Sequence, residues 1–152
     1  MKSAHLLLLG IIFNLAMVST CHTALAQTQH WRGPDQNGNF GPGDFPSSLN
    51  TNTLKWKSPL PGKGTSTPIL VDSKIFLTCP AEGKDCVLAF DFQGKELWRQ
   101  SLGAEVAGKH RNGSGSNPSA ATDGSHVFVY FKSGNLAGLD LDGKLLWKTN
   151  LQ

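Results

Sequence analysis

Two cysteines in the middle of the chain, Cys79 and Cys86, are the residues whose spacing most readily suggests chemistry. Residues 80–85 separate them, and an apolar, strand-like run lies on either side. If these runs pair as a hairpin with the cysteines opposite one another, the two Cβ atoms come within disulfide reach. A redox pair or half of a metal site is disfavoured, because the spacing is not CxxC and no partner ligands lie nearby. The pair predicts a structural disulfide, with free thiols as the alternative.

Asp91 and Asp140 are carboxylates that could be taken for an acid–base pair. Each precedes a glycine, Gly94 or Gly143, and the same 49 residues separate the two aspartates and the two glycines. This recurrence argues against catalysis, because a side chain that repeats at a turn usually accepts the backbone N–H groups of that turn. We expect both aspartates to hold tight turns in which glycine supplies a positive φ.

The polar stretch at residues 104–115 is the third place where chemistry could lie. Residues 109–112 read Lys-His-Arg-Asn, and residues 113–116 read Gly-Ser-Gly-Ser. A histidine in a polar loop is usually solvated. The Gly-Ser tract lacks the GKS or GKT of a phosphate-binding loop and the strand-turn-helix context of a nucleophilic serine. We expect a surface loop, in which residues 109–112 are the best candidate for a site outside any repeat.

An internal repeat positions most of these residues. The run from Val87 to Arg99 recurs from Leu136 to Lys148 at an offset of 49 residues, and a partial third copy covers residues 54–60. A recurring large aromatic is expected to pack between repeats, with its indole N–H on a backbone acceptor, rather than to stack on a ligand. The tryptophans at this position of the three copies are Trp56, Trp98 and Trp147.

Each repeat has the pattern of short β-strands. A period of two runs through residues 75–79 and 127–131: Ile75, Leu77 and Cys79 alternate with Phe76 and Thr78, and Val127, Val129 and Phe131 alternate with Phe128 and Tyr130. Turn residues lie at 72–74 and 123–125. Four antiparallel strands that recur about every 40 to 50 residues are typical of a propeller blade. The sequence therefore predicts an all-β fold of four-stranded antiparallel sheets that form part of a β-propeller.

The repeat motif is similar to that of a known family. Residues 136–147 read Leu-Ala-Gly-Leu-Asp-Leu-Asp-Gly-Lys-Leu-Leu-Trp, which resembles the pyrroloquinoline-quinone (PQQ) type of propeller repeat. The Trp-Arg-Gly-Pro of residues 31–34, followed by residues 60–68, is similar to the start of a group of exported bacterial PQQ-like repeat proteins. The resemblance covers about residues 31–152. It implies a propeller of about seven or eight blades, of which this sequence supplies about two.

Two functions follow from the resemblance. The first, which we favour, is a non-catalytic binding or assembly scaffold, similar to the propeller lipoprotein that assists outer-membrane assembly. The alternative is the N-terminal fragment of a PQQ-dependent quinoprotein dehydrogenase, an alcohol-type oxidoreductase with PQQ and calcium on the propeller axis. Those enzymes carry two adjacent cysteines against the quinone, which this sequence lacks. We predict no catalytic, cofactor-binding or metal-binding residue within this chain, so the active-site residues of an enzyme would lie outside it.

The N-terminus has the features of a secretory signal peptide. An apolar run at residues 6–18 is followed by Ala-Leu-Ala, which predicts cleavage between Ala26 and Gln27. A retained membrane anchor is the alternative, but the apolar run is short and interrupted. Acylation of Cys21, as in a lipoprotein, is disfavoured because the threonine before it is a poor match. We expect a periplasmic or secreted protein with no transmembrane segment after cleavage.

These observations divide the chain into five parts. They are a signal peptide at 1–26, an extended leader at 27–64 with an outer strand around Trp56, a blade at 65–103, an inter-blade loop at 104–115 and a blade at 116–152. A blade buries its faces only against its neighbours, so two blades would leave two apolar faces in water. We therefore expect a truncated piece of a longer propeller, or short chains that self-associate to close a ring.

The balance of charge bears on the partner. The formal net charge is +3, and basic residues are interspersed with acidic ones rather than gathered in a stripe. A nucleic-acid partner is therefore excluded. We expect the partner to be an unidentified protein or small-molecule ligand.

Overall fold

The computed structural model describes residues 30–33, 35–40, 42–43 and 46–152. The predicted signal peptide, its cleavage site at Ala26 and Gln27, and Cys21 lie outside the described residues. Within the described ranges the chain forms eight β-strands in two four-stranded antiparallel sheets. Among the described residues there is no helix that could span a membrane. The predicted all-β fold of propeller-type blades is confirmed.

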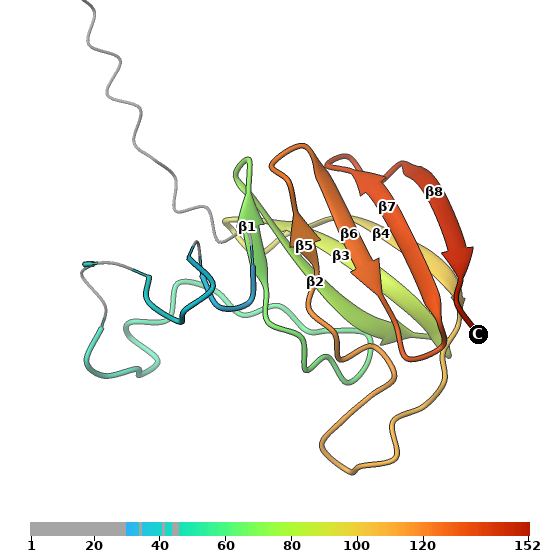
Figure 1. Ribbon diagram of the computed structural model, residues 1–152. Helices are drawn as coiled ribbons and strands as arrows, with labels where there is room; N and C mark the ends of the chain where they lie inside the picture. Colours follow the sequence, from blue (N-terminus) through green and yellow to red (C-terminus); the bar gives the residue numbers. More distant parts are fainter. Residues whose placement is uncertain (1–29, 34, 41, 44–45) are drawn as a thin grey trace, which may run out of the picture.

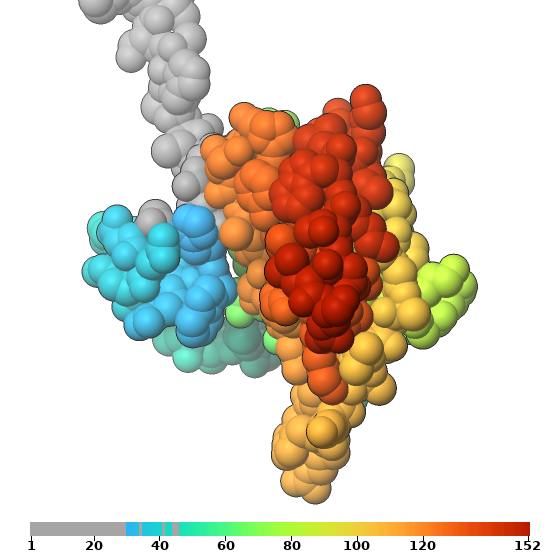
Figure 2. Space-filling model, turned by 45° about the vertical axis from the view of Figure 1, so that its right-hand side comes forward, coloured from blue at the N-terminus to red at the C-terminus, as the bar shows by residue number. Residues whose placement is uncertain are grey.

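Each blade is a meander in which every strand pairs with the next one along the chain (Figure 1). The strands of blade 1 are β1 (Ile69–Val71), β2 (Lys74–Ala81), β3 (Lys84–Asp91) and β4 (Glu96–Ala104). The strands of blade 2 are β5 (Ala121–Thr122), β6 (His126–Tyr130), β7 (Asn135–Asp140) and β8 (Leu145–Asn150). The connection between β4 and β5 projects from one end of the stacked sheets (Figure 2).

Residues with positive φ make the tight turns between strands. Ser73, in the β1–β2 turn, has a φ of 60°, and Gly124, in the corresponding turn of blade 2, has a φ of 92°. In the blade 2 turn the Asp123 carboxylate accepts hydrogen bonds from the His126 ring at 2.9 Å and from the Ser125 N–H at 2.8 Å. These bonds, first the one from His126, lower the pKa of Asp123 to about 2.

The strand register shows that the two blades are copies of one unit. Phe76 lies opposite Ala89 in blade 1, and Phe128 lies opposite Gly138 in blade 2. Because side chains alternate along a strand, each blade has two faces. We call the side that carries Phe76 in blade 1, or Phe128 in blade 2, the rear face, and the opposite side the front face. The rear face of blade 1 packs on the front face of blade 2.

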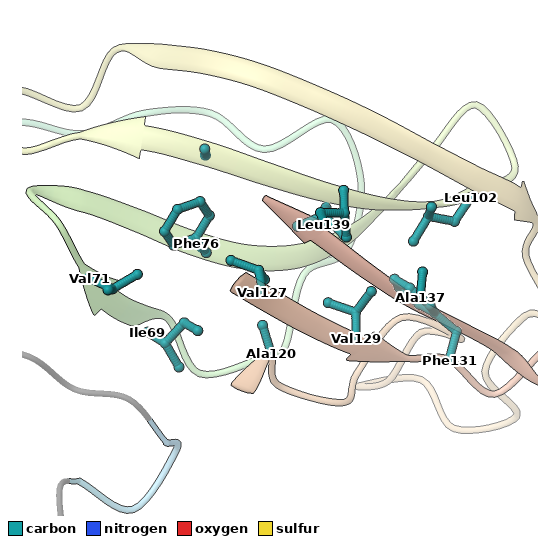
Figure 3. Close-up of a cluster of buried hydrophobic side chains, with 12 residues drawn as sticks. Ile69, Val71, Phe76, Leu102, Ala120, Val127, Val129, Phe131, Ala137 and Leu139 are labelled. Atoms are coloured by element: carbon teal, nitrogen blue, oxygen red, sulfur yellow. The ribbon is translucent and has the colours of Figure 1, made fainter. Parts of the chain in front are cut away.

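An apolar cluster fills the space between the blades, and side chains from both sheets point into it (Figure 3). Blade 1 and its edge contribute Ile69, Val71, Phe76, Val87, Ala89 and Leu102, and the other side contributes Ala120, Val127, Val129, Phe131, Ala137 and Leu139. Removal of this apolar area from water is the main force that holds the sheets together. A smaller buried cluster covers the front face of blade 1, with Cys79, Ala81, Cys86, Leu88 and Phe90.

The leader forms no regular secondary structure in its described part. The outer strand expected around Trp56 is not formed, and residues 54–60 belong to no sheet. A strand needs a neighbour to complete its backbone hydrogen bonds, and no described strand pairs with this segment. The end of the leader instead lies against the front face of blade 1, where Gly62 is beside Pro80 and Gly64 is beside Cys79.

Candidate functional site: the interface between the blades

Trp98 packs from blade 1 onto a turn of blade 2. Its indole Nε1 donates to the carbonyl of Leu141 at 3.2 Å, and its ring lies 5.7 Å from the ring of Phe76 between centroids. The indole covers Gly143, where an added Cβ would lie 2.6 Å from the ring. Gly143 also has a φ of 88°, so glycine meets two requirements at this position. We call the glycine turn and its carbonyl acceptor the tryptophan socket.

Trp56 of the leader fills an equivalent socket on blade 1. Its Nε1 donates to the carbonyl of Phe92 at 2.7 Å, and a Cβ at Gly94 would lie 2.5 Å from its ring. Phe92 and Gly94 precede Leu141 and Gly143 of the blade 2 socket by 49 residues, which is the repeat offset. Ser58 adds a hydrogen bond from its hydroxyl to the Gly94 carbonyl. The leader thus makes the contact that an adjacent blade would make.

Trp147 has no socket within the described part of the chain. It lies on the rear face of blade 2, where it is 43% exposed and covers Gly138 of its own sheet. No described acceptor binds its Nε1. Of the three equivalent tryptophans, two are docked on a neighbouring turn and the third faces solvent.

The two repeated aspartates bind their own turns. Asp91 Oδ1 accepts the N–H groups of Gln93 and Lys95, both at 2.9 Å. Asp140 Oδ1 accepts the equivalent pair, from residues 142 and 144, at 3.0 and 2.8 Å. These bonds hold Gly94 at a φ of 81°, which presents a flat surface to the incoming indole. The carboxylates therefore shape the socket and do not face one another.

A buried polar cluster lies at one end of the interface, around Asp85. This residue is fully buried, and its carboxylate accepts hydrogen bonds from Ser116 Oγ at 2.9 Å, Ser133 Oγ at 2.5 Å and Asn135 Nδ2 at 3.0 Å. A buried carboxylate is costly unless donors satisfy its oxygens. Here the two serine hydroxyls and the asparagine amide, which all follow β4 in the chain, satisfy the Asp85 carboxylate of blade 1.

Sequence reasoning missed this cluster, although the repeat contains a signal for it. At the repeat offset Asp85 corresponds to Gly134, and Asn135 corresponds to Cys86. Polar residues at strand positions where the other copy has none indicate a contact that belongs to one interface and not to every blade. The general pattern of the fold does not require such residues, so only the departure from the repeat points to them.

The β4–β5 connection separates into a structural part and an exposed part. Ser114 Oγ donates to Asn117 Oδ1 at 3.0 Å, and Thr78 Oγ1 donates to the Ser116 carbonyl at 2.9 Å. The Gly-Ser tract therefore anchors the connection to blade 1. Residues 109–112 are exposed, and the Asn112 N–H donates to His110 Nδ1 at 3.1 Å.

Cys79 and Cys86 lie directly opposite one another on β2 and β3, and both are buried. They are free thiols in this structure, and Cys79 Sγ donates to the Gly62 carbonyl at 3.2 Å. Burial is the main cause that raises the pKa of each thiol above the ordinary value of 9.0. The register places both side chains on the front face of blade 1, but the disulfide stays a prediction.

Among the described residues, no three or more His, Cys, Asp or Glu side chains form a group that could hold a metal ion. The one fully buried carboxylate of the interface, Asp85, already has its oxygens bound by three donors.

An apolar groove of about 220 Å³ lies between the leader and the front face of blade 1. It is lined by Trp56, Ser58, Leu60, Pro68, Ile75, Leu77 and Phe90. At the repeat positions of Ile75, Leu77 and Phe90, blade 2 has Val127, Val129 and Leu139, which pack in the core cluster. The groove therefore corresponds to a space that is filled in the interface between the blades.

Comparison with known proteins supports a family assignment. A protein-family model matches residues 47–152, well over half of the chain, and that family is described as outer membrane protein assembly factor BamB. The matched residues include Trp56 and both blades. No curated protein matches the chain.

Alanine at Gly143 should destabilise the protein more than alanine at Gly124. Both positions have a positive φ, 88° and 92°, so the backbone strain is shared. An added Cβ would strike the Trp98 ring at Gly143, whereas nothing lies within 4 Å at Gly124. We expect Gly143→Ala to lose at least about 1 kcal/mol more of the free energy of unfolding, measured by urea denaturation. Equal losses would contradict the tryptophan socket.

Asp85→Ala should lower the free energy of unfolding by about 1 to 3 kcal/mol, because it leaves the donors of the buried cluster without an acceptor. Asp85→Asn keeps one acceptor oxygen and should lose less. The control is Asp142→Ala, at a side chain that is 87% exposed and pairs with Lys74, and it should have little effect. If the Asp85 and Asp142 variants unfold alike in urea, the cluster does not stabilise the interface.

Export to an oxidising compartment should join Cys79 to Cys86. Trypsin cleaves after Lys84, so a disulfide would hold the peptides of residues 75–84 and 85–95 together until a reductant is added. Mass spectrometry of the exported chain, digested in urea, measures this. Recovery of two separate peptides without reduction would disprove the disulfide, and alkylation of the folded chain should then be slow because burial raises both thiol pKa values.

Proposed function

The chain belongs to the PQQ-like repeat family of the outer membrane protein assembly factor BamB, and on this basis we propose that it is an exported, non-catalytic scaffold that binds a partner protein in outer-membrane assembly. The family match across both blades carries this proposal. The interlocked interface supports it, because a loop on a rigid scaffold can present a binding surface without large loss of entropy.

The exposed part of the β4–β5 connection, residues 109–112, is the surface that we assign to partner binding. Two lysines tie this connection to the rest of the molecule: Lys63 Nζ donates to the Arg111 carbonyl, and Lys132 Nζ donates to the Ala107 carbonyl at 2.6 Å. The tip is therefore held in place while its cationic side chains, Lys109 and Arg111, remain in solvent. A protein surface with acidic groups would complement it.

The proposed location is the periplasm or the exterior of the cell. The predicted signal peptide before Gln27 is the reason for this part of the proposal. An exported scaffold is also the setting in which an oxidised Cys79–Cys86 pair would be stable.

A photoreactive amino acid at Lys109 should cross-link the exported chain to a protein of the outer-membrane assembly machinery in intact cells. The control is the same amino acid at Ser125, an exposed turn residue at the opposite end of the blades. A Lys109 cross-linking pattern that does not differ from the Ser125 pattern would overturn the proposal. A rise in the unfolding midpoint on addition of PQQ with calcium would favour the dehydrogenase alternative instead.

A further inference from the structure

The rear face of blade 2 is an apolar surface that remains exposed. Trp147 is 43% exposed and Tyr130 is 45% exposed, and the Phe128 ring lies 6.3 Å from the Trp147 ring between centroids. Figure 2 looks toward this side of the molecule, with β8 in red at the front. The strand register gives these residues the positions that Trp98, Thr78 and Phe76 hold in the interface between the blades.

The front face of blade 1 is only partly covered. The leader supplies Trp56 to its socket, but no described residue supplies the counterpart of the Phe76 ring. In the interface between the blades, Phe76 packs in one cluster with Val127 and Val129. Their counterparts on blade 1, Ile75 and Leu77, line the apolar groove. The groove thus lacks the aromatic ring that the rear face of a blade would insert.

We propose that the rear face of blade 2 docks onto the front face of blade 1 of a second copy of this chain. Trp147 of one copy enters the socket of the other, donates its Nε1 to the Phe92 carbonyl and displaces Trp56. Phe128 fills the apolar groove. The proposed contact repeats the interface already seen between the two blades. The rear face of blade 2 has the repeat positions of the rear face of blade 1, and the front face of blade 1 has those of the front face of blade 2.

The leader segment at residues 54–60 can be displaced because its hydrogen bonds to blade 1 come from two side chains, Trp56 and Ser58, and a docking tryptophan can replace the first of them. Residues 54–60 pair with no strand, and Trp56 remains 38% exposed although its Nε1 is bonded. A docking blade offers the same indole contact and adds the ring that the groove lacks. The leader and a second copy are therefore competitors for one socket, and this competition limits how tightly the copies bind.

The docking is head to tail, since the two surfaces differ. Such heterologous contacts build rings when the rotation closes and open filaments when it does not. The inference depends on blade packing and holds whether or not the chain serves as an assembly scaffold.

Opposite effects of two equivalent tryptophans test the proposal. Sedimentation velocity over a range of concentrations should show that this 152-residue chain self-associates, that Trp147→Ala weakens the association at least about tenfold, and that Trp56→Ala strengthens it by freeing the socket. Tyr130→Lys, at an exposed position on the same face, should also weaken the association, and it guards against a Trp147 variant that fails to fold. A monomeric wild type, or equal association of all variants, would overturn the proposal.

A cross-link tests the orientation of the copies. Lys74 of blade 1 and Asp142 of blade 2 form an ion pair at 2.8 Å, and their counterparts at a head-to-tail contact are His126 and Gln93. A short bismaleimide should therefore join His126→Cys chains to Gln93→Cys chains in a mixture, but neither variant to itself. The unmodified chain is the control for the native cysteines. Self-linking of the His126→Cys variant would indicate packing of rear face on rear face and would overturn the head-to-tail arrangement.

Discussion

The stacking of the blades depends on an indole that lies flat on the glycine turn of the next sheet. Apolar burial alone would allow two flat sheets to slide past each other, because the hydrophobic effect has no direction. The hydrogen bond from Trp98 Nε1 to the Leu141 carbonyl and the missing Cβ at Gly143 remove that freedom. The turn aspartate, Asp140, stabilises the socket before any partner arrives, since its bonds are all within the turn.

The leader shows how far a single tryptophan can imitate a blade. Trp56 reproduces the hydrogen bond and the glycine contact of Trp98 without a strand around it. Trp56 does not reproduce the apolar packing of a sheet, and an apolar groove therefore remains beside it on the front face of blade 1. Two contributions to blade stacking are thus separable in this fold. The hydrogen-bonded anchor requires only one tryptophan and one glycine turn, whereas burial of the apolar surface requires the whole face of a neighbouring sheet.

Much of this architecture could be predicted from the sequence, because it repeats. The strand alternation, the turn glycines and the three equivalent tryptophans all recur at a near-constant spacing, and recurrence is visible without coordinates. The outer strand around Trp56 could not be judged in this way, since a strand also requires a neighbour. The Asp85 cluster was missed for a related reason. Two of its donors, Ser133 and Asn135, stand where the other copy has Lys84 and Cys86, so the repeat gives no sign of them, and only folding brings them to Asp85.

The Asp85 cluster makes the two units non-interchangeable. A carboxylate that leaves water must meet hydroxyl and amide donors, so a blade with Asp85 on its rear face discriminates among neighbours that would otherwise look alike. Tandem arrays of similar units are prone to misassembly and swapping during folding. Because only blade 2 carries the donors for Asp85, this buried acid favours one order of the two blades. Recombination between the repeats of such a gene would separate Asp85 from its donors.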